Sequence, residues 1–352
     1  MLKTFSLIKT WVVEFFRPCP NNSIIKRDGE FLICGHRGIP VKEVENTIKS
    51  FERALKEGAN SLETDLCLTK DNEVVLWHDW NPNEINALLR ESGFEPWVKY
   101  KPLPPPLFSE LRKPIRELTL KEFRENYDYK KRKRNPRRVN AHIPTLREFF
   151  EWCAEQNKIK LIFFDIKTPG EEANLSLNIM NCLNELVKQF KPEFQIVIET
   201  IEPEVLKVLK EKFPQYDYTL DIDPNPGFIF NPEDYSAVKA AINYDNNYAI
   251  AFRPQKVTIA NWTTYRRIVQ FDLGLKEEHN TSYPENKIAL VGCTVNKRKE
   301  LRCLFRLGIN GIQTDYPQRL KRIAEGRKIG FRRKIFAGPL RFKRNRKRQN
   351  KN

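Results

Sequence analysis

Short apolar runs recur along the chain and alternate with helix-like segments, and this alternation constrains the fold more than any other feature. The runs are rich in Ile, Leu and Val, as strands buried on both faces of a parallel sheet are. The expected strands are residues 31–36, 60–66, 159–165, 195–200, 217–222, 248–252, 288–295 and 311–314.

Helices are expected between these strands, at residues 46–57, 144–157, 171–190, 203–213, 260–271 and 297–307. The link from 223 to 247 gives no clear helical pattern. Eight strands joined by helices over about 250 residues predict an α/β fold of the (β/α)8 TIM-barrel type. A doubly wound sheet is the alternative that the pattern alone leaves open.

The length of 352 residues allows one large domain with an insertion and terminal extensions. We expect an N-terminal helical segment at 1–30, a barrel domain at 31–326 and a basic tail at 327–352. Residues 80–142 interrupt the alternation with several prolines and little periodicity. They are interpreted as an insertion in the loop after the second strand, at the end of the barrel where active sites form.

Positive charge is concentrated in two places rather than spread over the chain. The formal net charge is +17, and residues 319–352 carry 15 Lys and Arg against one acid. The run 130–138 carries seven cations in nine residues, so the rest of the chain is slightly acidic. This distribution argues against nucleic acid as the principal partner. It predicts instead that the tail binds an anionic membrane surface.

Neither a membrane span nor a disulfide framework is expected. No uncharged apolar run approaches the ~20 residues that a spanning helix needs, and charges interrupt the apolar N-terminus. The chain has seven Cys, and Cys34, Cys67, Cys182 and Cys293 each lie among aliphatic residues. Scattered cysteines of this kind are typical of buried reduced thiols. We therefore expect a cytoplasmic protein that contacts membranes peripherally.

Charged and polar residues gather where the apolar runs end. They are His36 and Arg37 after the first run, Glu63 and Asp65 in the second, His78 soon after it, Asp165 and Lys167 after the third, and Asn296 and Asp315 after the last two. Glu63 and Asp65 are two residues apart, so they point to the same face of the strand, with Cα atoms ~6.6 Å apart. The C-terminal strand ends of a barrel converge, and we expect these side chains to form one site.

The residue types in this set suit metal-assisted cleavage of a phosphodiester. Glu63, Asp65 and Asp165 provide hard oxygen ligands for Mg²⁺ or Ca²⁺. The cations Arg37 and Lys167 could bind a phosphate. His36 and His78 could exchange protons during displacement at phosphorus. Taken singly, each would more often be structural, but two of the four histidines fall at these strand ends. The other two, His142 and His279, do not lie at the end of an expected strand beside other candidate site residues.

The stretch GHRGIPVKEVENTIKSFERALKEGANSLETDLCLTKDNEVVLWHD resembles the signature of the glycerophosphodiester phosphodiesterase family, with HRG, ENT, Glu-x-Asp, Thr-x-Asp and His-Asp elements in order. Downstream, LTLKEF, HIPTLREFF, FFDIK, CTVNKR and GINGIQTDYP fit the same family. The resemblance spans roughly residues 31–320. It implies a (β/α)8 barrel that uses a divalent metal to hydrolyse glycerophosphodiesters to glycerol 3-phosphate and an alcohol.

The resemblance also implies roles for individual residues. They are acid and base for His36 and His78, metal binding for Glu63, Asp65 and Asp165, phosphate binding for Arg37 and Lys167, and support of the site for Glu45, Asn46 and Asn296. Two positions depart from the family pattern. Asp165 stands where many members have Glu, and Cys293 stands where Trp often precedes the TVN motif.

A second resemblance leaves an alternative activity open. ANSLETDL, LIFFDIKT and the segment from TVNKRK to TDYP are also similar to sphingomyelinase D-like phospholipases. That similarity implies phospholipase D-type cleavage of lysophospholipids or sphingomyelin. The HRG and ENT motifs and the intact WHD favour the first family. A lipid-binding pseudoenzyme is the non-enzymatic alternative, and the intact histidines and carboxylates argue against it.

Overall fold

The computed structural model describes residue 19 and residues 29–132, 137–166, 168, 172–222, 235–252 and 260–326. The predictions for Lys167, for most of the N-terminal segment 1–30 and for the tail 327–352 therefore concern residues outside these ranges.

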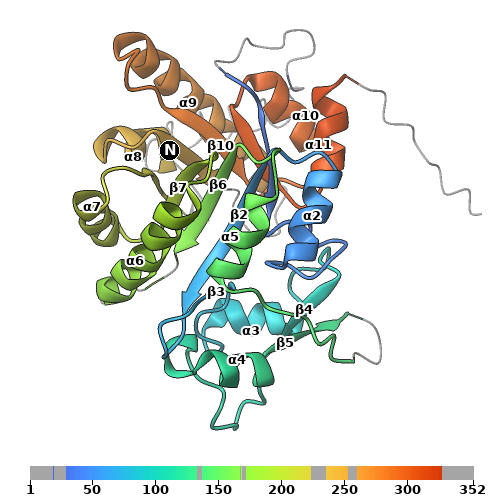
Figure 1. The fold of residues 1–352 in the computed structure, drawn as a ribbon. Helices are drawn as coiled ribbons and strands as arrows, with labels where there is room; N and C mark the ends of the chain where they lie inside the picture. Colours follow the sequence, from blue (N-terminus) through green and yellow to red (C-terminus); the bar gives the residue numbers. More distant parts are fainter. Residues whose placement is uncertain are drawn as a thin grey trace, which may run out of the picture.

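Eight parallel strands form a nearly closed barrel, seen at the centre of Figure 1. The strands are β1 (Leu32–His36), β2 (Ser61–Leu68), β6 (Leu161–Ile166), β7 (Gln195–Thr200), β8 (Asp217–Leu220), β9 (Tyr248–Phe252), β10 (Ala289–Cys293) and β11 (Gly311–Thr314). Their order is β8-β7-β6-β2-β1-β11-β10-β9, and a parallel bridge from Ile222 to Ala251 joins the two ends. The predicted (β/α)8 barrel is confirmed, and this closure excludes the doubly wound alternative.

Helices surround the barrel and correspond closely to the expected segments. They are α2 (Ile48–Lys56), α5 (Leu146–Ala154), α6 (Ala173–Phe190), α7 (Pro203–Lys212), α8 (Ala237–Asn243), α9 (Ala260–Ser282), α10 (Arg298–Leu307) and α11 (Pro317–Ala324). The sequence pattern missed α8 and α11 and ended α9 too early. α8 has seven residues and α11 has eight, too few to show helical periodicity clearly.

Strand side chains alternate between two cores. Phe163, Val197 and Val291 belong to a cluster that fills the barrel interior. Ile162 and Phe164, on the opposite face of β6, pack with the surrounding helices. This interior cluster fills the barrel before the C-terminal strand ends. Polar residues further along the same strands therefore lie on top of an apolar layer.

The connection between β3 (Val74–Leu76) and α5, which we call the β3–α5 connection (residues 77–145), contains the proline-rich stretch. β3 pairs antiparallel with β2. The connection then forms α3 (Ile85–Ser92), β4 (Tyr100–Leu103), a short 3-10 helix (Ile115–Glu117), α4 (Leu120–Asn126) and β5 (Asp128–Lys131). Its core includes four buried aromatic side chains, Trp77, Phe123, Tyr127 and Tyr129. In Figure 1 it lies at the end of the barrel toward which β2 points.

One cysteine expectation is wrong. Cys19 and Cys303 form a disulfide with Cα atoms 5.5 Å apart, joining positions 284 residues apart in the sequence. Two cysteines 284 residues apart form no short spacing motif, so the sequence did not indicate this pair. Cys34, Cys67 and Cys293 are buried and form no disulfide, as expected, whereas Cys182, also outside the disulfide, is only half-buried. In the described part of the chain, none of the helices is both long and apolar enough to cross a membrane.

Candidate active site

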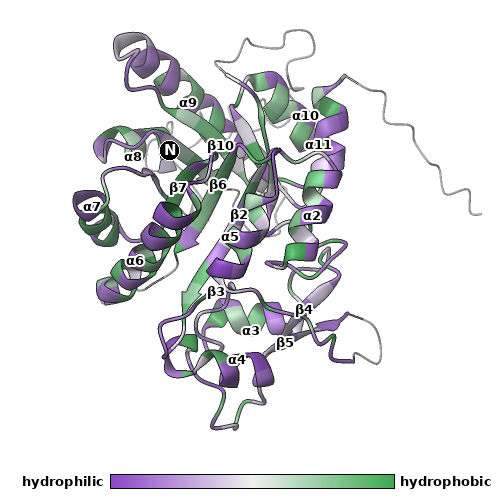
Figure 2. Cartoon of the chain, in the orientation of Figure 1, coloured by the Kyte–Doolittle hydropathy of each residue, from purple (hydrophilic) through white to green (hydrophobic). Residues whose placement is uncertain are grey.

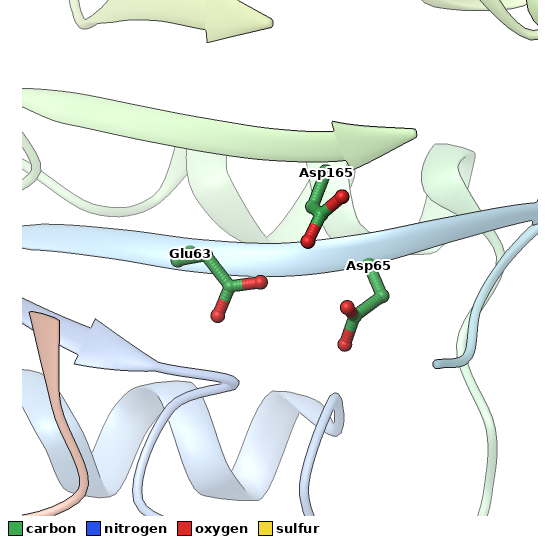
Figure 3. Close-up of side chains that lie close together, drawn as sticks. All are labelled: Glu63, Asp65 and Asp165. Carbon is green, nitrogen blue, oxygen red and sulfur yellow. The ribbon is translucent and has the colours of Figure 1, made fainter. Parts of the chain in front are cut away.

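Three carboxylates meet inside the barrel at its C-terminal end (Figure 3). Glu63 and Asp65 come from β2, and Asp165 stands directly beside Asp65 on the neighbouring β6. Glu63 pairs in register with Phe163, an interior residue, so all three carboxylates face the barrel interior. One oxygen of each lies within 4.8 Å of the other two, and all three residues are buried.

One member of this trio, Glu63, has a shifted pKa. The pKa of Glu63 is raised to about 7, chiefly by burial and also by the nearby Asp65, while His36 and Arg37 act in the opposite direction. A divalent cation would relieve the repulsion between these carboxylates, and carboxylate oxygens are the ligand type that both Mg²⁺ and Ca²⁺ prefer. The residues therefore fit the metal that the sequence predicts. Asp165 also lies in a second buried trio, with Glu199 at the end of β7 and Asp221 after β8.

Arg37 lies against these carboxylates. Its backbone N–H donates to Glu63 Oε2 at 2.7 Å, and its Nε lies 3.1 Å from Asp65 Oδ2. Its φ of 51° is in the left-handed region, which turns the chain back over the site. The guanidinium also contacts Glu45 at 3.3 Å and Glu95 at 3.8 Å. The predicted phosphate-binding arginine is thus buried among acids, and its contact with phosphate stays a prediction.

His36 is oriented by a chain of hydrogen bonds. Its Nδ1 lies 2.9 Å from Asp315 Oδ1, and its Nε2 lies 4.0 Å from Glu63 Oε2. Asn296 holds Asp315 twice, because its Nδ2 donates to Asp315 Oδ2 and its Oδ1 accepts from the Asp315 N–H. Burial and Arg37 lower the pKa of His36, but Glu63 and Asp315 outweigh them, so its pKa is raised. Asn296 and Asp315, both identified at strand ends, therefore act on one histidine.

His78 is oriented in the same way by a neighbouring acid. Its Nδ1 lies 2.7 Å from Asp79 Oδ1, and Arg90 NH1 lies 2.6 Å from that same oxygen. Burial would raise the pKa of Asp79, but Arg90 and His78 hold it well below its ordinary value. Arg90 also pairs with Glu45 and, at 3.1 Å, with Glu95. The arginine on α3 thereby joins the His78 side of the site to Arg37, which contacts the same two acids.

The ENT residues hydrogen-bond or pair with side chains of the candidate site, including the predicted metal ligand Asp65. Asn46 Nδ2 donates to Asp65 Oδ2 at 2.8 Å, and Asn46 Oδ1 accepts from Thr64 Oγ1. Asn46 is completely buried and has a φ of 52°, a conformation that Asn tolerates better than most residues. Glu45 accepts from Tyr129 Oη at 3.2 Å besides pairing with Arg37 and Arg90. The supporting roles of Glu45 and Asn46 have a direct geometric basis.

Sequence reasoning missed several members of the site. Asp79 follows His78 directly, so the His-Asp motif in the sequence could have identified it. Glu199 and Asp221 were visible as charged ends of two expected strands. Arg90 left no signal, because it lies in a stretch without periodicity. The structure places His142 on the surface beside Glu148, and His279 near Asn286, both outside the site.

A parallel barrel whose C-terminal end carries a carboxylate trio and two carboxylate-oriented histidines defines a hydrolase of the barrel phosphodiesterase class. The glycerophosphoryl diester phosphodiesterase family model matches residues 36–319, and the chain belongs to this family. The resemblance found in the sequence is thereby confirmed.

Individual relatives agree with this assignment. The chain is 24% identical over 299 residues to a glycerophosphodiester phosphodiesterase of Bacillus subtilis, covering 84% of this chain and 87% of that protein. It is 31% identical over 312 residues to lysophospholipase D GDPD1 of Mus musculus, covering 81% and 83%. The crystal structure of a putative glycerophosphoryl diester phosphodiesterase from Silicibacter pomeroyi has the same fold, with a TM-score of 0.59, 17% identity and coverage of 91% and 99%.

The two departures from the family pattern can now be placed. Asp165 occupies its position in the trio with a side chain one methylene shorter than Glu. Cys293 is buried at the end of β10, where its thiol contacts Gln313 Oε1 at 3.1 Å. Gln313 in turn donates to Glu199 at 2.8 Å. Hydrogen bonds therefore connect Cys293, at the position where the family often has Trp, through Gln313 to Glu199 of the second trio.

Proposed function

We propose that the chain hydrolyses glycerophosphodiesters to glycerol 3-phosphate and an alcohol, with His36 and His78 as the acid and base. The observation that carries the proposal is the pairing of each histidine, through Nδ1, with a carboxylate that is itself held in place. A carboxylate that accepts from Nδ1 leaves Nε2 for proton transfer, and at His78 the Arg90 NH1 group also lies 2.9 Å from Nδ1. Two such histidines beside one acidic trio suit displacement at phosphorus.

In this mechanism one histidine accepts a proton from the attacking oxygen while the other donates a proton to the departing alcohol oxygen. The new P–O bond forms on the side opposite the one that breaks, so the two proton transfers are separated in space. Glu63, Asp65 and Asp165 would hold a divalent metal, which when bound supplies charge stabilisation for the phosphate. Asn46 keeps Asp65 oriented, and Asn296 keeps Asp315 oriented.

The identity of the metal is part of the proposal, and we propose Mg²⁺ or Ca²⁺. Turnover should fall to background in a chelator and return when either ion is added back. Asp65→Asn should abolish turnover while leaving the circular dichroism spectrum unchanged, because it removes one ligand charge and keeps the side-chain volume. Full activity in chelator would contradict the assignment of the trio as a metal site.

A second substrate class is proposed because the mouse relative is a lysophospholipase D. Its chemistry is the same displacement at phosphorus, with lysophosphatidic acid in place of glycerol 3-phosphate. The decisive experiment is a product analysis of purified protein with glycerophosphocholine, lysophosphatidylcholine and sphingomyelin, each with Mg²⁺ or Ca²⁺. Cleavage of none of the three would favour the lipid-binding pseudoenzyme.

We also propose a cytoplasmic location at an anionic membrane surface, bound through the basic tail. Five of the seven cysteines form no disulfide, as expected in a reducing compartment, and the Cys19–Cys303 disulfide is the exception. The high positive charge of residues 319–352 supports attraction to anionic lipid. Salt-sensitive binding to anionic vesicles that is lost on removal of residues 327–352 would support the tail's role.

A further inference from the structure

Large apolar side chains are exposed at several positions of the β3–α5 connection. Among the described residues, six of the nine exposed large hydrophobics lie there, and we call them the apolar surface: Ile85, Leu89, Phe94, Trp97, Leu107 and Phe108. Phe108 is fully exposed, and Ile85 and Leu107 are each more than 60% exposed. Single exposed apolar residues are common on proteins, but six within 24 residues of sequence need an explanation.

The helix α3 separates this surface from the active site. Ala87 and Arg90 form its buried face, and Arg90 contacts Glu45, Asp79 and His78. Ile85 and Leu89 are four residues apart, so they share the opposite, solvent-facing side. An α-helix with side chains is about 10 Å across, so these two side chains lie roughly one helix diameter from His78. In the hydropathy view, α3 shows apolar residues at the end of the molecule beyond β3 (Figure 2).

The other members of the apolar surface are tied to the two ends of α3. The backbone N–H of Phe94 donates to Leu89 O at 2.9 Å, which fixes the turn that leads to Trp97. The loop that carries Leu107 and Phe108 is held by Arg112, whose guanidinium donates to Pro105 O, Pro82 O and the Glu91 carboxylate. The three stretches are therefore parts of one fixed structure.

Cations flank this surface. The β4–β5 ribbon carries Lys101, Lys130 and Lys131, and Arg132 follows it directly. Arg132 donates to Glu95 O at 2.8 Å, which places its guanidinium in the turn between Phe94 and Trp97. The whole stretch 80–142 carries 15 Lys and Arg against 8 Asp and Glu. Aromatic and aliphatic side chains bordered by cations complement the interface of an anionic bilayer, whose headgroups are charged and whose interior is apolar.

We propose that the apolar surface docks the protein on an anionic lipid bilayer, with the mouth of the barrel facing the membrane. The inference deepens the proposed function and rests on it only for the choice of substrate. A diester with an acyl chain would then reach the site from the bilayer, because the surface lies only about one helix diameter from His78. The side chains project from a helix, a turn and a loop. A fluid lipid surface accommodates such projections without a matching groove, which a protein partner would need.

The test uses the full chain and sedimentation with two kinds of vesicle: phosphatidylcholine alone, and equal parts phosphatidylcholine and phosphatidylserine. The variant is Leu107→Ser with Phe108→Ser. The matched control is Ile242→Ser with Tyr283→Ser, two exposed apolar residues outside the connection. The wild type and the control should bind the anionic vesicles equally, and the variant at least about tenfold more weakly. Binding should be weak to vesicles without phosphatidylserine and should fall with salt.

Three results would overturn the proposal. One is equal binding of the variant and the wild type, with loss only when residues 327–352 are removed, which would assign docking to the tail alone. Another is a change from dimer to monomer in the variant with unchanged vesicle binding, which would make the surface a contact between two copies of the chain. The third is no binding to either vesicle. Hydrolysis of soluble glycerophosphocholine, measured in parallel, should be the same in all variants. Its absence throughout would refute the proposed function and leave the docking result standing.

Discussion

At the scale of single residues, each proposed catalytic histidine contacts a carboxylate that is itself bound by a neighbouring side chain. His36 depends on Asp315, and His78 depends on Asp79. Removing a positioned acid or base costs ~10²–10⁴ in rate, so His36→Ala and His78→Ala should each lose at least about a hundredfold in kcat on glycerophosphocholine. His142→Ala and His279→Ala provide matched controls, since both lie outside the site. Near-normal turnover in either site variant would remove that histidine from the mechanism.

Arg90 presents a test of positioning rather than of chemistry. It bridges Asp79, Glu45 and Glu95 from α3. Without it, Asp79 loses the charge that keeps it ionised and fixed beside His78, so we expect Arg90→Met to lower kcat by about 10²-fold and to change KM little. The reason is that the variant loses the positioning of His78 through Asp79, which affects the reaction step more than substrate binding.

Arg112 is the matched control for Arg90. It is equally buried in the same connection but bonds to Pro82, Pro105 and Glu91, away from both histidines. Arg112→Met should destabilise the protein by a similar amount, about 3–5 kcal/mol for a broken buried pair, with kcat preserved where the protein is still folded. Equal losses of kcat in the two variants would show that Arg90 only stabilises the fold. Partial recovery of kcat in Arg90→Lys would support positioning.

At the scale of elements, the sequence predicted most of what the strands carry and little of what the β3–α5 connection carries. Glu63 and Asp65 could be placed on one face because strand side chains alternate. Asp165 could be placed beside them because strand ends converge in a barrel. Arg90 and Tyr129 could not, because both come from short elements whose position depends on the aromatic core of the connection. Periodicity has too few residues to act on in elements of this length.

The start of α5 gives a stability prediction at this scale. Thr145 and Glu148 form a capping box, in which the Thr145 hydroxyl accepts from the Glu148 N–H and the Glu148 carboxylate accepts from the Thr145 N–H. Thr145→Ala removes a helix cap that is typically worth about 1 kcal/mol of unfolding free energy. Thr281→Ala is the control, because the Thr281 hydroxyl bonds only within α9 and is exposed. Urea unfolding should separate the two variants, and equal midpoints would show that the cap contributes nothing.

At the scale of the whole molecule, charge is arranged in zones. The barrel end gathers buried acids around Glu63 and Asp165, the connection carries flanking cations, and the tail adds fourteen net positive charges after residue 318. An anionic substrate or surface is therefore attracted to the outside of the molecule. The carboxylates inside are matched by Arg37, Arg90 and the predicted metal. Because of this separation, the net charge of the chain indicates nothing about the acidic site inside the barrel.

The pH dependence of global stability provides a prediction at a residue that is not part of the candidate site. Asp272 on α9 is completely buried, and its Oδ1 accepts from Ser236 Oγ and from the Val238 N–H at the start of α8. Burial raises the pKa of Asp272 from 3.8 to about 7. The folded chain therefore keeps this proton up to about pH 7, whereas the unfolded chain releases it near pH 4. Because unfolding releases a proton in this window, stability falls as pH rises from about 4 to about 7.

Asp272→Asn tests this linkage, since the amide keeps the acceptor oxygen and the volume but cannot ionise. One pKa unit corresponds to about 1.4 kcal/mol, so the full shift corresponds to at most about 4 kcal/mol of unfolding free energy. Urea unfolding at several pH values between 4 and 8 should show the wild type losing stability relative to Asp272→Asn as pH rises. The difference between the two proteins cancels the contributions of every other titrating group, which both share. Parallel curves would mean that Asp272 is ionised in the folded state, and that the α8–α9 contact holds a buried charge.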